Sequence, residues 1–198
     1  MEINLSDFVK DFRRNDHWDD HEWPFNGKLA AVEFSECNKL HLAEKFSQIK
    51  DSAKAILEIG VCKNASDSSN YIFFKNKNQN TIYIGVDLLD KSFLNNKEQN
   101  IYTLQTDSSN YEFIMSECAK LGVFEFDFIF IDGYHSINQC IKDWKFVDNL
   151  SDHGIVGLHD TSNHPGPLAL VENINKDKWN LEVYCFDDNG IAFFTKKN

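Results

Sequence analysis

Short runs of apolar residues recur along the chain from about residue 54 onward, and each run has the length of one β-strand. Continuous apolar runs of this kind suit parallel strands that helices cover on both faces, because neither face of such a strand meets water. We therefore expect strands over residues 55–59, 82–86, 101–104, 126–131 and 154–158.

Apolar residues at helical spacing fill the gaps between these strands. Ser136 and Gln139 have the spacing of a capping box, and an apolar stripe follows them. Ser109 and Glu112 have the same spacing before a second stripe. Helices are therefore expected after Ser136 and Ser109, and also over residues 66–75 and 168–174.

The end of the chain has a different pattern. Residues 181–186 and 191–195 both have strand character, and the Asn189-Gly190 pair between them is a strong signal for a hairpin turn. Alternating strands and helices that end in an antiparallel hairpin predict a doubly wound, mostly parallel α/β sheet of seven strands. We expect one domain over residues 1–198, with an α/β core over 54–198 and an N-terminal helical arm or lid over 1–50.

The charge balance disfavours some classes of partner. The 198 residues include 20 Lys and Arg against 31 Asp and Glu, for a formal net charge of −11. Nucleic acids and anionic membrane surfaces attract basic patches, and no basic run is longer than a pair such as Lys196-Lys197 at the tail. No apolar stretch approaches the roughly 20 residues that cross a bilayer. An acidic surface is compatible with a cationic ligand or a divalent metal.

The five cysteines are widely spaced, odd in number and without a CxxC motif. This pattern argues against a disulfide framework and a zinc knuckle, and it indicates a reducing compartment. The N-terminus lacks the basic start and apolar run of a signal peptide, so a cytoplasmic protein is expected.

One N-terminal segment, residues 15–25, combines aromatic and acidic side chains with His17 and His21. We expect this segment to be either a lid over a binding pocket or a packed arm that makes a dimer contact. A zinc site on the two histidines is a less favoured alternative, because no further ligand set is evident.

Acidic residues and histidines gather after the carboxyl ends of the expected parallel strands. Ligands of open α/β sheets bind beyond these ends, where the strand order reverses. Gly60 would let the backbone approach a ligand closely, and Asp87 is suited to the two hydroxyls of a ribose. The structural alternative is that Gly60 only makes a tight turn and Asp87 only caps a helix. The other polar residues at strand ends are Asp107, Asp132, His135, His159 and Asp160.

The loop after the first strand lacks the full glycine motif of dinucleotide-binding sheets. Cys62 and Asn64 stand where further glycines are expected. A pyrophosphate needs close backbone approach at a helix N-terminus, so this loop disfavours NAD and FAD. It favours a nucleoside ligand without phosphate.

Residues 54–170 resemble a class I S-adenosylmethionine-dependent methyltransferase. The similarity is to the small-molecule O-methyltransferase branch that includes catechol O-methyltransferase-like and macrocin-type enzymes. The motifs that carry it are Leu57-Glu58-Ile59-Gly60 with Ser66, Ile84-Gly85-Val86-Asp87, Phe128-Ile129-Phe130-Ile131-Asp132-Gly133 with His135, and Leu158-His159-Asp160-Thr161.

The resemblance implies a role for each matching residue. It implies that S-adenosylmethionine is bound by Glu58, Gly60, Cys62, Ser66, Asp87, Asp107 and Asp132, with Asp87 at the ribose and Asp107 at the adenine. It implies that Mg²⁺ or a similar divalent cation is held by Asp132, Asp160 and Thr161. His135 falls at the position of the general base, beside Asp132 in the catalytic centre.

Elementary chemistry agrees with these roles. Methyl transfer from a sulfonium is an in-line displacement that needs aligned reactants and removal of the acceptor proton. A cation bound through oxygens would lower the pKa of a coordinated hydroxyl, and a histidine titrates near neutral pH. The structural alternatives are that Asp132 only ends a strand and that Asp160 and His135 only cap the segments that follow them. His159 is expected to be a packed or supporting residue rather than a ligand.

The expected function is methylation of a hydroxyl on a small molecule such as a sugar, a polyketide-type compound or a phenol. Two alternatives remain open. One is an NAD-dependent oxidoreductase on a similar sheet, which the glycine-poor loop disfavours. The other is a catalytically inactive cofactor-binding module.

Overall fold

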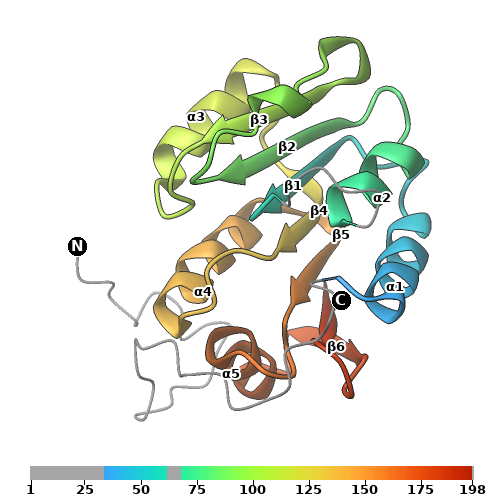
Figure 1. The fold of residues 1–198 in the computed structure, drawn as a ribbon, viewed down its shortest axis with the longest axis vertical. Helices are drawn as coiled ribbons and strands as arrows, with labels where there is room; N and C mark the ends of the chain where they lie inside the picture. The colour runs from blue at the N-terminus through green and yellow to red at the C-terminus, as the bar shows by residue number, and fades with distance from the viewer. Residues whose placement is uncertain (1–33, 62–67, 198) are drawn as a thin grey trace.

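The computed structural model describes residues 34–61 and 68–197, and its centre is one seven-stranded sheet (Figure 1). The strand order is β3-β2-β1-β4-β5-β7-β6. Strands β1 to β5 are parallel, whereas β7 runs antiparallel to both β5 and β6. The strands are β1 (Ala55–Ile59), β2 (Ile82–Asp87), β3 (Ile101–Gln105), β4 (Phe126–Ile131), β5 (Leu150–His159), β6 (Trp179–Tyr184) and β7 (Ile191–Lys196). The predicted doubly wound sheet with a C-terminal antiparallel hairpin is confirmed.

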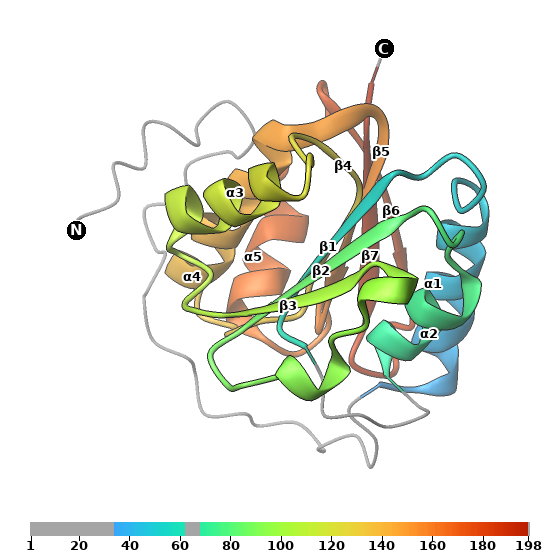
Figure 2. The ribbon, with the colours of Figure 1, turned by 90° about the horizontal axis from the view of Figure 1, so that it is seen from above.

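In the part of the chain that the structure describes, five α-helices cover the two faces of this sheet. Helices α3, α4 and α5 lie on one face, and α1 and α2 lie on the other (Figure 2). Short 3₁₀ segments of the described chain lie at Ser92–Leu94, Lys97–Gln99 and Lys145–Asn149. The α-helices are α1 (Glu36–Ser47), α2 (Ser69–Asn76), α3 (Tyr111–Lys120), α4 (Ile137–Trp144) and α5 (Pro165–Asn173).

Each face of the sheet has its own apolar core, which explains the continuous apolar runs. In β4, Ile129 and Ile131 pack against the α3–α5 side, while Phe128 and Phe130 pack against the α1–α2 side. The core under α1 and α2 is aromatic, with edge-to-face contacts of Phe46 to Phe128 at 5.7 Å between ring centroids. Both faces of the strand are dry, so no polar alternation remains in its sequence.

The two predicted capping boxes have different outcomes. Ser136 caps α4, because its Oγ accepts a hydrogen bond from the Gln139 amide at 3.2 Å. The prediction for Ser109 is wrong: α3 begins at Tyr111, with Asn110 as its N-cap and no side-chain cap bond. The reason is local, since Asp107 Oδ1 accepts the Ser109 amide at 2.8 Å and holds Ser109 in a turn before the helix.

Other element boundaries shift by a few residues. Helix α5 begins at Pro165, three residues before the expected start, because proline suits the first helical position. The expected helix over 66–75 corresponds to α2, and residues 62–67 lie outside the described residues. None of the described helices combines the length and apolar character needed to span a membrane.

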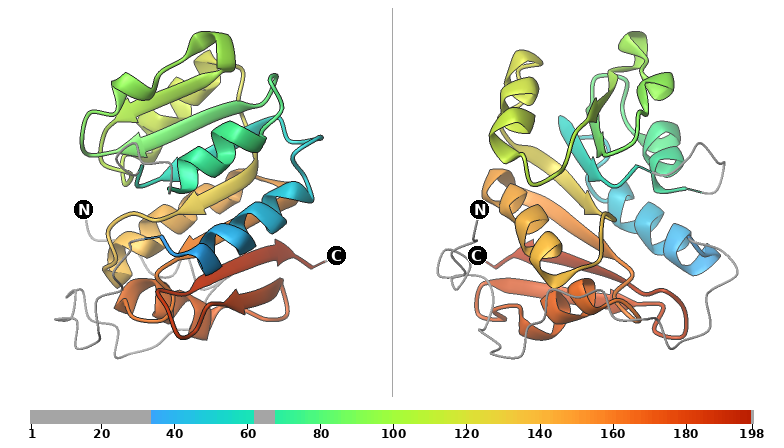
Figure 3. Two further views of the ribbon diagram at one scale, coloured as in Figure 1. Left: turned by 45° about the vertical axis from the view of Figure 1, so that its right-hand side comes forward. Right: turned by 60° about the vertical axis from the view of Figure 1, so that its left-hand side comes forward.

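The cysteine pattern argues against disulfides, and for one pair this expectation is wrong. Cys37 and Cys185 form a disulfide, with their Cα atoms 6.0 Å apart across 148 residues of sequence. Helix α1 lies beside the C-terminal strands (Figure 3, left), so packing brings together two residues whose sequence spacing gives no hint of contact. Cys118 and Cys140 are buried and take no part in a disulfide.

Replacing the α4 cap should destabilise the fold measurably. We expect Ser136→Ala to lower the free energy of unfolding by about 0.5–2 kcal/mol, because the Gln139 amide loses its acceptor. The matched control is Ser109→Ala, which should change that free energy by less than about 0.5 kcal/mol. Denaturant unfolding of both variants checks this. Equal losses in the two variants would contradict the assignment of the caps.

Candidate active site

A cavity of about 380 Å³ opens at the carboxyl ends of β1, β2 and β4. The strand order reverses between β1 and β4, and ligands bind at this switch point in open α/β sheets. Four of the predicted site residues line the cavity: Gly60, Asp87, Asp107 and Asp132. The structure therefore brings together the residues predicted to bind ribose, adenine and the reacting end of the cofactor.

Gly60 is required at the end of β1 for two reasons. Its φ is +82°, a left-handed conformation that L side chains rarely adopt. A Cβ at this position would lie 2.0 Å from the carbonyl oxygen of Asp132. The glycine therefore lets the ends of β1 and β4 approach closely and also leaves a bare backbone in the cavity wall.

The Asp87 carboxylate is held in place by the backbone around it. Oδ2 accepts the Val61 amide at 3.0 Å, and Oδ1 accepts the Leu89 amide at 2.7 Å. Lys91 Nζ lies 3.6 Å from Oδ2. Each carboxylate oxygen has a second lone pair, so a fixed Asp87 can still accept from a ligand in the cavity.

Asp107 is fixed in a similar way at the end of β3. The hydrogen bond from the Ser109 backbone lowers the pKa of Asp107, so this residue is a carboxylate at neutral pH. Asp87, Asp107 and Asp132 then give the cavity wall an acidic character, and the lining contains no Lys or Arg among the residues that the structure describes.

Glu58 does not line the cavity, although the resemblance places it near the cofactor. Its side chain is fully buried and accepts hydrogen bonds from the hydroxyls of Ser69 and Tyr83. Burial raises the pKa of Glu58 to about 8. Glu58 thus joins β1, β2 and the start of α2 behind the cavity.

Two carboxylates and a histidine meet beside the cavity, at the ends of β4 and β5. His159 Nδ1 lies 2.9 Å from Asp132 Oδ1 and 3.3 Å from Asp160 Oδ2. One ligand atom from each of these three residues falls within 4.8 Å of the others, which is the spacing of a metal site. The prediction that Asp132 and Asp160 lie together is consistent with this geometry.

Asp160 has an unusual backbone and two histidine partners. Its φ is +58°, which is uncommon for a residue other than glycine and is typical of functional sites. His135 Nε2 lies 2.9 Å from Asp160 Oδ2. Burial alone would raise the pKa of Asp160, but the hydrogen bonds with His135 and His159 lower it well below its usual range.

His159 is held from its other side by a residue that the sequence did not indicate. Asn38, fully buried in α1, places its Nδ2 2.8 Å from His159 Nε2. Burial alone would lower the pKa of His159, but Asp132 and Asp160 raise it to about 10. Asn38 Oδ1 has no hydrogen-bond partner among the described residues, so turning the amide over would pair it with a protonated Nε2.

Of the remaining residues that the sequence singled out, two lie within the described part of the chain and the others lie outside it. Thr161 is buried, and its hydroxyl lies against the backbone of Gly190, without a hydrogen-bond partner in the described part of the chain. His164, at the N-cap of α5, places its ring 4.0 Å from that of His135. Cys62 and Ser66, together with Asn64 and the segment 15–25, lie outside the described residues.

Comparison with known proteins identifies the fold. No protein-family model matches the chain, and no curated protein sequence does. The MycE methyltransferase from the mycinamycin biosynthetic pathway, in complex with Mg, SAH and mycinamycin VI, matches with a TM-score of 0.59 and 19% identity over 80% of this chain. This chain spans about half the length of MycE, with 49% of it covered.

Two other structures match over most of both chains. CalS11, a TDP-rhamnose 3'-O-methyltransferase of calicheamicin biosynthesis, gives a TM-score of 0.61 and 14% identity over 81% of this chain and 80% of its own. The O-methyltransferase from Bacillus cereus in complex with SAH gives 0.56 and 16% identity, over 85% and 84%. The chain therefore shares its Rossmann-like fold with these three methyltransferases.

The buried Glu58 should make stability depend on pH. The folded state keeps a proton on Glu58 up to about pH 8, while the unfolded chain loses it near the ordinary value of 4.5. The free energy of unfolding should therefore fall, relative to that of Glu58→Gln, as the pH rises from 4.5 to 8. The expected difference is on the order of a few kcal/mol.

Denaturant unfolding at several pH values checks this expectation. Exposed Glu125 supplies the control, since Glu125→Gln should differ from the parent by a small amount that is constant with pH. A constant difference for Glu58→Gln as well would show that Glu58 is ionised in the folded protein.

Proposed function

We propose that this chain is an S-adenosylmethionine-dependent O-methyltransferase that acts on a hydroxyl of a small molecule. The observation that carries the proposal is the cavity at the switch point, with Asp87 and Asp107 in its wall. Asp132, His159 and Asp160 form an acid–histidine cluster at the adjacent strand ends. The structural neighbours support it, because MycE was solved with Mg and SAH and the Bacillus cereus protein with SAH.

The cavity suits a nucleoside that carries positive charge. Its volume of about 380 Å³ lies in the usual range for small-molecule sites. Asp87 would accept from the ribose hydroxyls, Asp107 from the adenine amino group, and Gly60 would leave room for the ligand beside the β1 backbone. Three carboxylates in the wall attract a sulfonium and repel a pyrophosphate, which favours S-adenosylmethionine over NAD.

The acid–histidine cluster provides a fit for a divalent cation. Asp132 and Asp160 would hold it through carboxylate oxygens, with the buried Thr161 hydroxyl as a further oxygen ligand. When bound, such a cation would lower the pKa of the acceptor hydroxyl. His159 and Asn38 would position the two carboxylates from behind.

His135 would take the acceptor proton. A carboxylate can only accept hydrogen bonds, so the contact with Asp160 puts a proton on His135 Nε2. In the neutral ring Nδ1 is then the basic nitrogen. Asp160 would stabilise the imidazolium that forms when Nδ1 takes the proton, as the orienting carboxylate does in other acid–histidine pairs.

The proposed acceptor is a hydroxylated sugar, polyketide-type compound or phenol. CalS11 is a sugar 3'-O-methyltransferase, and MycE was solved with mycinamycin VI. An inactive cofactor-binding module is the second candidate function, because Cys62 and Asn64 stand where the loop after β1 is expected to carry glycines. Turnover with any acceptor would exclude that candidate.

Removal of the proposed ribose ligand should weaken cofactor binding. We expect Asp87→Ala to lose roughly 10- to 150-fold in affinity for S-adenosylmethionine and for SAH, since a charged hydrogen bond is worth about 1.5–3 kcal/mol. Exposed Asp90, in the same loop, supplies the control Asp90→Ala, which should bind as the parent does. Calorimetry measures both, and NAD should give no binding. Absence of S-adenosylmethionine binding at millimolar concentration would exclude the proposed function.

Removal of the proposed base should slow the reaction without weakening cofactor binding. We expect His135→Ala to lower turnover by about 10²–10⁴-fold. The measurement is SAH release with Mg²⁺ and the best acceptor from a panel of sugars, polyketides and phenols. The parent rate should rise with pH through one ionisation that the variant lacks, whereas exposed His153→Ala should keep the parent profile. Parental turnover in His135→Ala would leave His135 with a structural role only, as the partner of Asp160.

A further inference from the structure

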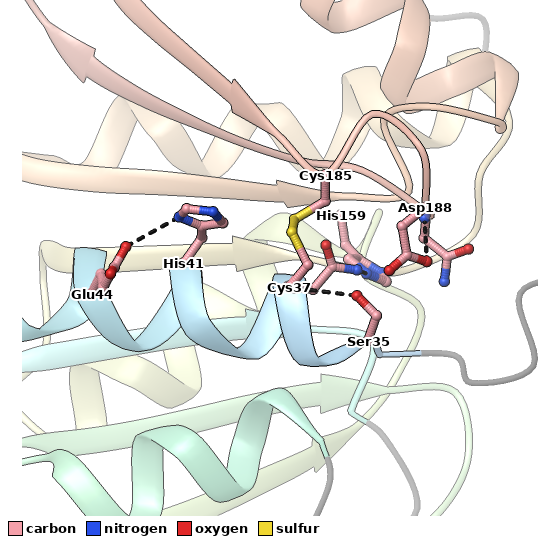
Figure 4. Close-up of a disulfide and its surroundings, with 9 residues drawn as sticks. Ser35, Cys37, His41, Glu44, His159, Cys185 and Asp188 are labelled. Atoms are coloured by element: carbon pink, nitrogen blue, oxygen red, sulfur yellow. Dashed lines mark hydrogen bonds and ion pairs between the residues drawn. A yellow bond between two sulfur atoms is a disulfide. The ribbon is translucent and has the colours of Figure 1, made fainter.

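A second cluster of metal-ligating side chains lies outside the proposed active site, where α1 meets the loop after β6. It consists of Cys37 and His41 from α1 and Cys185 from the β6–β7 loop (Figure 4). One ligand atom from each residue lies within 4.8 Å of the other two. All three residues are half-buried, so solvent and small ions can reach them.

The histidine of this cluster is oriented as metal-bound histidines are. Cys37 and His41 are four residues apart and therefore share one face of α1. His41 Nδ1 lies 3.1 Å from Glu44 Oε2, which leaves Nε2 as the nitrogen that can bind a metal. A carboxylate on the second ring nitrogen is the usual outer partner of a metal-bound histidine. The ring also stacks on Tyr184, with centroids 4.0 Å apart.

We propose that Cys37, His41 and Cys185 bind Zn²⁺ when their disulfide is reduced. Two thiolates and one imidazole nitrogen are ligands that Zn²⁺ prefers, and its fourth position would take water. An external dithiol supplies the two electrons that break the sulfur–sulfur bond, and it becomes a disulfide itself. The two thiols then release their protons to solvent as Zn²⁺ binds.

The ligands stay close together after reduction, because other contacts hold α1 in place. Lys45 of α1 pairs with Glu182 of β6, and His41 stacks on Tyr184 of the same strand. The Asn38 contact with His159 ties the first turn of α1 to the end of β5. None of these contacts involves sulfur. The reduced site is therefore largely preformed, which lowers the ordering cost of binding.

The ligand chemistry separates this site from the acid–histidine cluster. Asp132 and Asp160 offer oxygens, which suit hard cations such as Mg²⁺, whereas two thiolates select softer ions such as Zn²⁺. The two sites are nonetheless linked through α1, because Cys37 directly precedes Asn38, which contacts His159. Either cross-link, disulfide or Zn²⁺, would fix Asn38 against His159.

The test uses the full-length protein, reduced with a phosphine that is then removed, and Co²⁺ alone as a spectroscopic probe. We expect one equivalent of Co²⁺ to give a thiolate charge-transfer band and the visible bands of tetrahedral coordination. The oxidised protein should give neither. Zn²⁺ should displace Co²⁺ and abolish both. Cys37→Ser and Cys185→Ser should each weaken the charge-transfer band, and the double variant should lose it.

Variants that retain both cysteines test the proposal independently of the thiols. Glu44→Gln should weaken Zn²⁺ binding by about 10- to 100-fold, and His41→Ala, which removes a ligand, should weaken it more. The control His153→Ala should bind as the parent does. Circular dichroism checks that each variant is folded. A charge-transfer band that survives in the double cysteine variant, no band in the reduced parent, or unchanged Zn²⁺ affinity in His41→Ala would each overturn the proposal.

Discussion

The close approach of β1 and β4 at their carboxyl ends is the constraint on which the site depends. Gly60 lies against the Asp132 carbonyl, at a distance that no side chain allows. Because of this contact, the cavity wall at the end of β1 lies directly beside Asp132 at the end of β4, the first carboxylate of the acid–histidine cluster. A larger residue at position 60 would separate the two strands and both halves of the site at once.

Contacts with backbone amides and histidines fix the carboxylates at this edge of the sheet. Asp87 is held by two backbone amides, Asp132 by His159, and Asp160 by two histidines. The carboxylates therefore have set directions before any ligand arrives. Preorganised charge of this kind lowers the reorganisation that binding or catalysis requires.

The sequence predicts those parts of the structure that follow from local pattern and strand direction. Buried parallel strands have continuous apolar runs, and their carboxyl ends share one edge, so Asp87 and Asp132 could be placed beside a common cavity. Asn38 and the Cys37–Cys185 bond could not be placed, because they depend on how α1 packs across the C-terminal strands. The prediction that Ser109 caps α3 is wrong for a local reason. Asp107, two residues earlier, accepts the Ser109 amide, which the predicted capping box assigns to Glu112.

The disulfide also determines which part of the chain would carry a pulling force. The covalent loop from Cys37 to Cys185 encloses β1 to β6 and all the helices after the first turn of α1, while β7 lies outside it. Force applied to the chain on either side of this loop would pass through the sulfur bridge. It would peel β7 from β5 and β6 and leave the six enclosed strands without tension. In the thiol form the same force would reach every strand of the sheet.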